Sequence, residues 1–264
     1  MTDYSIRYWC AVGAGAAGLL AAIQPIVAAP DGERPPAASG SASLQPRRID
    51  SNVYAVGAVT LDKERGTVSF PVSVNQRSGV VEYAVVTAAG KTHESVFRTE
   101  AQPQQIHLAM LLLGARPANT DFFPADRSTP PPGERVMLEV SWKDAGRETR
   151  RALEDFVVTT NNHRTLAKGP WAYNGSYLAG TNFVAQRDGS IISVHVDPDA
   201  LINNPRPGRE DDDLHHVNTP ALPPEGVPVQ LIIRLASRGV RAEGSATTLA
   251  PPSDAAALPK QKPK

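Results

Sequence analysis

The chain has 264 residues, of which 41% are hydrophobic and 20% are charged, so it holds enough apolar material for one large domain or two small ones. Its 27 Lys and Arg balance its 27 Asp and Glu, and this zero net charge argues against nucleic acid or an anionic membrane surface as the main partner. The only cysteine is Cys10, which excludes a Cys-bound zinc site, an iron–sulfur cluster and a thiol nucleophile from the rest of the chain.

Residues 1–28 are typical of a signal peptide. Arg7 supplies a positive charge, residues 8–23 are apolar and rich in Ala and Gly, and Ala28 offers a small residue for cleavage. We expect cleavage before Ala29, which would place the mature protein in the periplasm or outside the cell. The alternative is an uncleaved N-terminal anchor in the inner membrane, with the domain facing the periplasm. That anchor would be the protein's only contact with a membrane.

Composition divides the remaining chain into three parts. Residues 29–50 are rich in Pro, Ala and Ser and are expected to form a flexible linker. Residues 237–264 have a similar composition and are expected to be a disordered tail. The domain itself is therefore predicted to span residues 51–236.

Most of this domain alternates between apolar and polar residues, or runs apolar with β-branched side chains, as strands do. The predicted strands cover residues 53–60, 67–74, 80–87, 135–142, 151–158, 177–186, 190–196 and 228–235. One helix is predicted over residues 103–113, with Pro103 in its first turn and Gly114 at its end, and one further helical turn over residues 197–202. We expect His107 to pack against the sheet with one ring nitrogen bonded. The fold class is mainly β: an antiparallel β-sandwich or barrel-like domain with one packed α-helix.

Two polar segments interrupt the β pattern, at residues 90–95 and 201–218. A packed core has little use for such side chains, so they are expected on loops, where binding sites are often found. We expect the two loops to converge at one rim of the sheet and to bind a polar small molecule or an envelope protein. The residues assigned to this site are Lys91, His93, Glu94, Asn203, Asn204 and His216.

A structural interpretation of the same residues stays open. The two Asn side chains can simply close a turn, and Glu94 can satisfy backbone groups of its own loop beside a half-buried His93.

The second segment also carries possible metal ligands. Carboxylate and imidazole groups suit Zn, Mn, Fe or Ni, but their spacing here matches no metal motif, and a run of three Asp is more often a solvated loop. We therefore predict no cofactor and a non-catalytic binding module. The alternative is a metal-dependent or acid–base enzyme, with His93, Glu94, His215 and His216 in one cleft. The possible ligands of a divalent metal are His93, Glu94, Asp212, Asp213, His215 and His216.

Several separated motifs resemble the YdjY domain, a family of exported bacterial proteins. The resemblance covers residues from about 52 to 234. It rests on Val80-Val81-Glu82-Tyr83, on residues 90–95, on the helical residues 106–114, on Asp197-Pro198 with residues 201–205, and on His216-Val217-Asn218. The resemblance implies an exported domain and carries over no catalytic residue.

Overall fold

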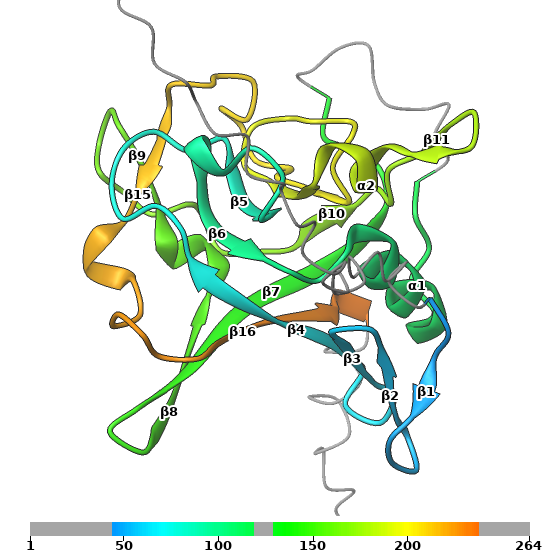
Figure 1. Cartoon of the computed structure of the whole chain (residues 1–264). Coiled ribbons are helices and arrows are strands. Elements are labelled where there is room, and N and C mark those ends of the chain that lie inside the picture. The colour runs from blue at the N-terminus through cyan, green and yellow to red at the C-terminus, as the bar shows by residue number, and fades with distance from the viewer. Residues whose placement is uncertain (1–43, 119–128, 238–264) are drawn as a thin grey trace, which may run out of the picture. The chain divides into compact units, whose positions relative to one another are not determined.

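A computed structural model describes residues 44–118 and 129–237 and shows a mainly β fold, as predicted (Figure 1). The predicted signal peptide, the linker up to residue 43 and the tail from residue 238 lie outside the described residues. Within the described residues, no helix has the length and apolar character needed to cross a membrane.

Eight strands close into a barrel, so the barrel-like alternative holds and the sandwich does not. Closure occurs where β6 pairs with β4, through Val74 and Phe97. The pairs are antiparallel except β5–β6 and β13–β14, which are parallel. In order around the barrel the strands are β4 (Thr67–Val74), β16 (Val229–Leu235), β7 (Glu134–Asp144), β10 (Trp171–Tyr173), β14 (Ile202–Asn203), β13 (Ser190–Ser193), β5 (Tyr83–Thr87) and β6 (Ser95–Thr99).

Additional strands extend this sheet or pair beside it. Beyond β4 the sheet continues with β3 (Val59–Asp62), β2 (Val53–Val56) and β1 (Arg47–Arg48), each paired with the strand before it. In addition, β8 (Arg147–Ala152) pairs with β7. Two small sheets consist of β9 (Val157–Thr159) with β15 (His215–Val217), and β11 (Leu178–Ala179) with β12 (Asn182–Phe183).

Five local predictions are corrected. Residues 53–60 are two strands rather than one, because Gly57 adopts a φ of 58° and reverses the chain. Residues 177–186 are not one strand but the β11–β12 hairpin followed by α2 (Val184–Asp188). Residues 198–201 form turns and bends instead of a helical turn, and Ile202 begins β14. Residues 151–158 are not one strand, because η3 (Leu153–Phe156) separates the end of β8 from the start of β9. Finally, Arg47 and Arg48, placed in the linker, pair with β2.

The predicted helix is confirmed as α1 (Pro103–Leu113), which packs against β2, β3 and β4. Gln102 and Gln105 form a reciprocal capping box at its start, and Gly114 ends it in the left-handed conformation. The Nδ1 atom of His107 lies 2.8 Å from the Tyr173 hydroxyl, so the expected packing of this histidine is also confirmed.

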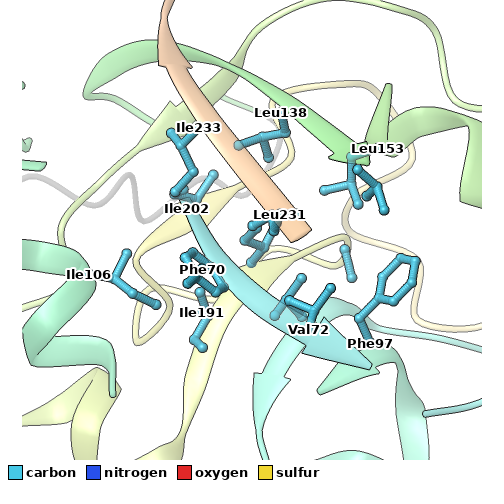
Figure 2. Close-up of a cluster of buried hydrophobic side chains, with 14 of the residues drawn as sticks. Phe70, Val72, Phe97, Ile106, Leu138, Leu153, Ile191, Ile202, Leu231 and Ile233 are labelled. Atoms are coloured by element: carbon cyan, nitrogen blue, oxygen red, sulfur yellow. The ribbon is translucent and has the colours of Figure 1, made fainter. Parts of the chain in front are cut away.

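The barrel interior is filled by alternate side chains of its strands. On β4 the residues Val68, Phe70 and Val72 are buried, with more exposed neighbours between them. Figure 2 shows Phe70 beside Leu231 of β16, with which it pairs across the two strands. Burial of each such side chain contributes about 1.5–3 kcal/mol relative to exposure. The result is a rigid scaffold from which the polar loops project.

Candidate functional site

The two polar segments lie on either side of residues 80–82. The backbone N–H of Val81 donates to the carbonyl of His215 at 2.9 Å, and that of Glu82 donates to the carbonyl of Glu94 at 3.0 Å. Val80 also forms a bridge with His216. Figure 1 accordingly shows β9 and β15 near the ends of β5 and β6. Both segments therefore bond to the same short stretch of backbone, one on either side of it.

The parallel pairing of β5 and β6 determines where Lys91 lies. Tyr83 pairs with Ser95 and Thr87 pairs with Thr99, so the connection must return along the whole length of β5. This return includes the single turn η1 (Thr92–Glu94). It places Lys91 Nζ 2.9 Å from the Tyr83 hydroxyl and 4.9 Å from the ring centroid.

Tyr83 links Lys91 to the second half of the site. Its hydroxyl donates to Asp197 Oδ2 at 2.8 Å. Burial is the main cause that raises the pKa of Tyr83, and the nearby negative charge of Asp197 raises this pKa further. The hydroxyl therefore keeps the proton that it donates to Asp197.

Asn203 completes this chain of contacts but is not available to a ligand. Its Oδ1 accepts from the Asp197 backbone N–H at 2.8 Å, and its Nδ2 donates to the Asp197 carbonyl and to Asn174 Oδ1. Asn204 Nδ2 donates to the Val194 carbonyl at 3.0 Å, and both Asn side chains are 0% exposed. Asn204 closes a turn, as its Oδ1 accepts from the Arg206 backbone N–H at 3.1 Å, whereas Asn203 joins more distant segments of the chain.

The side chains on η1 remain accessible. Those of His93 and Glu94 are 78% and 20% exposed, and His93 Nε2 lies 3.7 Å from Glu94 Oε2. His93 is therefore not half-buried, because the short turn projects it into solvent. Lys91 Nζ lies 3.8 Å from Glu94 Oε1.

Glu82, which the sequence did not identify as a site residue, belongs to the same surface as Lys91, His93 and Glu94. Burial is the main cause that raises the pKa of Glu82, and the neighbouring carboxylate of Glu94 raises this pKa further. We call Glu82, Lys91, His93, Glu94 and Asp197 the polar rim.

His215 and His216 are neighbours on β15, so their side chains point to opposite faces of that strand. His215 is 1% exposed and pairs with Thr159 of β9, so both side chains lie on the same face of that two-stranded sheet. His216 is half-buried, and Asp212 and Asp213 are exposed in the preceding turn. In residues 44–118 and 129–237, no three His, Cys, Asp or Glu side chains gather closely enough to hold a metal ion.

His215 lines a cavity of about 640 Å³ that sequence analysis did not anticipate. We call it the basic cavity, after Arg164, Lys168 and Arg206 in its lining. His93 and Glu94 do not line it, so His215 and these two residues do not share this cavity. Its residues come from three separate parts of the chain and form no local motif.

Arg206 is held firmly in the wall of this cavity. Its Nη2 donates to Glu154 Oε1 at 2.6 Å and to the Gly169 carbonyl at 2.7 Å, and its guanidinium lies 4.9 Å from the centroid of the Trp171 ring. The contacts fix the guanidinium before any ligand arrives.

Comparison with known proteins places this arrangement in a family. The model of the YdjY domain matches residues 59–234, which include all eight barrel strands but the last residue of β16, both polar segments and the basic cavity. No curated protein and no solved structure matches the chain. Since the family match covers most of the sequence and agrees with the motifs that suggested it, the chain belongs to the YdjY domain family.

Proposed function

We propose that this domain is a non-catalytic binding module of the cell envelope that docks onto another envelope protein through the polar rim. The observation that carries the proposal is the fixed chain of contacts from Lys91 through Tyr83 to Asp197. It holds exposed charged groups in place on a rigid barrel.

The backbone of η1 is also fixed. Asn75 Nδ2 donates to the carbonyls of Thr92 and Ser95, at the two ends of this turn. A surface ordered before binding loses less conformational entropy on association. This supports recognition by a preformed surface.

Exposure favours a protein over a small molecule at the rim. Small-molecule sites usually bury about 70–90% of their ligand in a concave pocket. The side chains of His93 and Lys91 are instead 78% and 48% exposed. Charged side chains displayed this way suit the polar edge of a protein interface.

The arrangement also favours binding over catalysis. An acid–base site requires its titratable groups to converge on one reacting atom. Here His93 and Glu94 project from η1, whereas His215 faces the basic cavity.

The proposal is tested by photo-crosslinking in intact cells. A photoreactive residue replaces His93 in one strain and Arg147, at the exposed tip of the β7–β8 hairpin, in a control strain. We expect one defined envelope protein to be captured from position 93 only. The adduct should disappear when Lys91→Glu is added. Identical adducts from both positions, or none at position 93, would contradict docking at the rim.

Export is a separate part of the proposal and rests on residues 1–28. It is tested by N-terminal sequencing of the protein recovered from fractionated cells. We expect a mature chain that begins at Ala29 in the periplasm or the medium. An intact chain in the inner membrane supports the anchor, and a cytosolic chain that begins at Met1 contradicts export.

A further inference from the structure

We infer that the basic cavity binds a small molecule carrying a carboxylate or phosphate group. The site is distinct from the polar rim, and the inference does not depend on the proposed docking function. It rests on the shape of the cavity, on the buried imidazole in its lining and on the charges around it.

The cavity has the size of a small-molecule site and is open to solvent on the side of Arg164, Thr165 and Lys168, whereas Leu166 and His215 in its lining are buried. Its volume of about 640 Å³ lies within the roughly 300–1,000 Å³ typical of ligand pockets. Residues 159–168 form one wall, and Arg206 with Pro207 forms the other. The first wall is ordered by backbone bonds, since Thr159 donates to the Arg164 carbonyl and Leu166 donates to the Val157 carbonyl.

His215 supplies a polar atom without a partner. The side chain lines the cavity and is 1% exposed, and its Nε2 has no hydrogen-bond partner among the described residues. A buried polar atom left unpaired is destabilising and uncommon in folded proteins. A ligand oxygen accepting a hydrogen bond from this imidazole would satisfy it.

The charges that line the cavity are positive. Arg164, Lys168 and Arg206 contribute cations, and no Asp or Glu is among the lining residues. Glu154 pairs with Arg206 and Asp155 pairs with Lys168, both from outside the lining.

Arg164 supplies the charge that these pairs do not balance. In the described part of the chain, no carboxylate lies within ion-pair distance of its guanidinium. The excess of positive charge favours an anion and opposes a metal cation.

Arg206 retains capacity for a ligand. A guanidinium has five N–H donors. The bonds to the carbonyls of Ala167 and Gly169, to Glu154 Oε1 and to Asn204 Oδ1 use four of them, which leaves one on Nη1. Together with the planar fork of Arg164, this donor matches the oxygen atoms of a carboxylate or phosphate.

The test is calorimetric titration of the purified chain with three probes: inorganic phosphate, citrate, and glycerol as a neutral polar control. We expect saturable binding of at least one anion and none of glycerol. A stronger response to phosphate or to citrate decides which head group the cavity prefers. The absence of saturable binding by both anions, or equal binding of glycerol, overturns the inference.

Two matched variants locate the binding. Arg164→Gln removes an exposed charge from the cavity, and Arg147→Gln removes an exposed charge from the β7–β8 turn, outside the lining. We expect Arg164→Gln to weaken anion binding about tenfold, as the loss of one charged hydrogen bond does, and Arg147→Gln to leave it unchanged. Equal weakening by both variants means that the anions bind only to the general surface charge, and it overturns the site.

Discussion

Arg206 Nη2 and Glu154 Oε1 lie 2.6 Å apart, with side chains that are only 10% and 1% exposed. The same Glu154 oxygen accepts from the Trp171 indole and from the Gly169 backbone N–H, each at 3.2 Å. Burial lowers the pKa of Arg206, whereas the charge of Glu154 opposes this shift. The pair ties the loop that carries Arg206 to β10 of the barrel, and it supports a wall of the basic cavity.

Removing one member of this pair should be costly. Arg206→Met would leave the Glu154 carboxylate buried without its cation, and such changes destabilise proteins by about 3–5 kcal/mol. We expect a fall of that size in the free energy of unfolding, measured by urea denaturation at neutral pH.

An exposed pair provides the control for Arg206→Met. Arg150 and Glu148 are 49% and 51% exposed, with Nε and Oε1 2.8 Å apart. Exposed ion pairs add little to stability, because water and salt screen them, so Arg150→Met should change the free energy of unfolding very little. A similar small loss in both variants would show that the Glu154–Arg206 pair does not hold the loop.

The amide of Asn203 should matter for stability rather than for binding. Asn203→Ala removes two hydrogen bonds to the backbone of Asp197 and one to Asn174. At about 0.5–1.5 kcal/mol for each bond, and more where a buried group is left unpaired, the loss should reach about 2–4 kcal/mol. Asn161→Ala, in an exposed turn, is the matched control and should shift the urea midpoint very little. A near-neutral Asn203→Ala would contradict the structural role.

Gly133 should not tolerate a side chain. Its φ is 118°, and a Cβ atom placed there would lie 2.1 Å from the backbone oxygen of Tyr173 in β10. Gly146 also has a positive φ, of 82°, but a Cβ there meets nothing within 4 Å. Gly146→Ala should therefore cost about 1–2 kcal/mol from backbone strain alone. Gly133→Ala should cost considerably more or prevent folding, as measured by thermal unfolding and yield; equal costs would mean that the close approach is absent.

Local signals explain what could be predicted from the sequence. The bounds of α1 follow from Pro103, Gly114 and the apolar stripe between them, all within one segment. The hairpins around β3, β4, β7 and β8 follow from turn residues between alternating runs. The same local pattern predicts a single strand over residues 53–60, because the apolar alternation continues through the turn at Gly57.

Non-local contacts explain what could not be predicted. Lys91 lies over Tyr83 only because β5 and β6 are parallel, and sequence alternation does not reveal strand direction. Asn203 was assigned to a ligand because its partners, Asp197 and Asn174, become visible only in the folded chain. The sequence does not reveal the basic cavity, because its residues lie up to 56 positions apart, from Thr159 to His215, and meet through the pairing of β9 with β15.

The buried imidazole of His215 should make stability depend on pH. Burial lowers its pKa from 6.5 to about 4, although the charge of Asp211 opposes the shift. Between these two values the unfolded chain binds a proton that the folded chain does not, so stability is lost as the pH falls. At about 1.4 kcal/mol per pH unit, the free energy of unfolding should decrease by about 2 kcal/mol between pH 6.5 and pH 5. Urea denaturation across this range measures the decrease.

Burial also shifts the pKa of other groups, so the contribution of His215 must be isolated. Burial also lowers the pKa of His107, which acts in the same direction, whereas the raised pKa of Glu82 acts in the opposite direction. His215→Gln keeps both of these groups and removes only the imidazole at position 215. The variant should lose less stability than the original chain between pH 6.5 and pH 5, whatever its stability at pH 7. Parallel curves for the two proteins would show that His215 does not control the acid sensitivity of the fold.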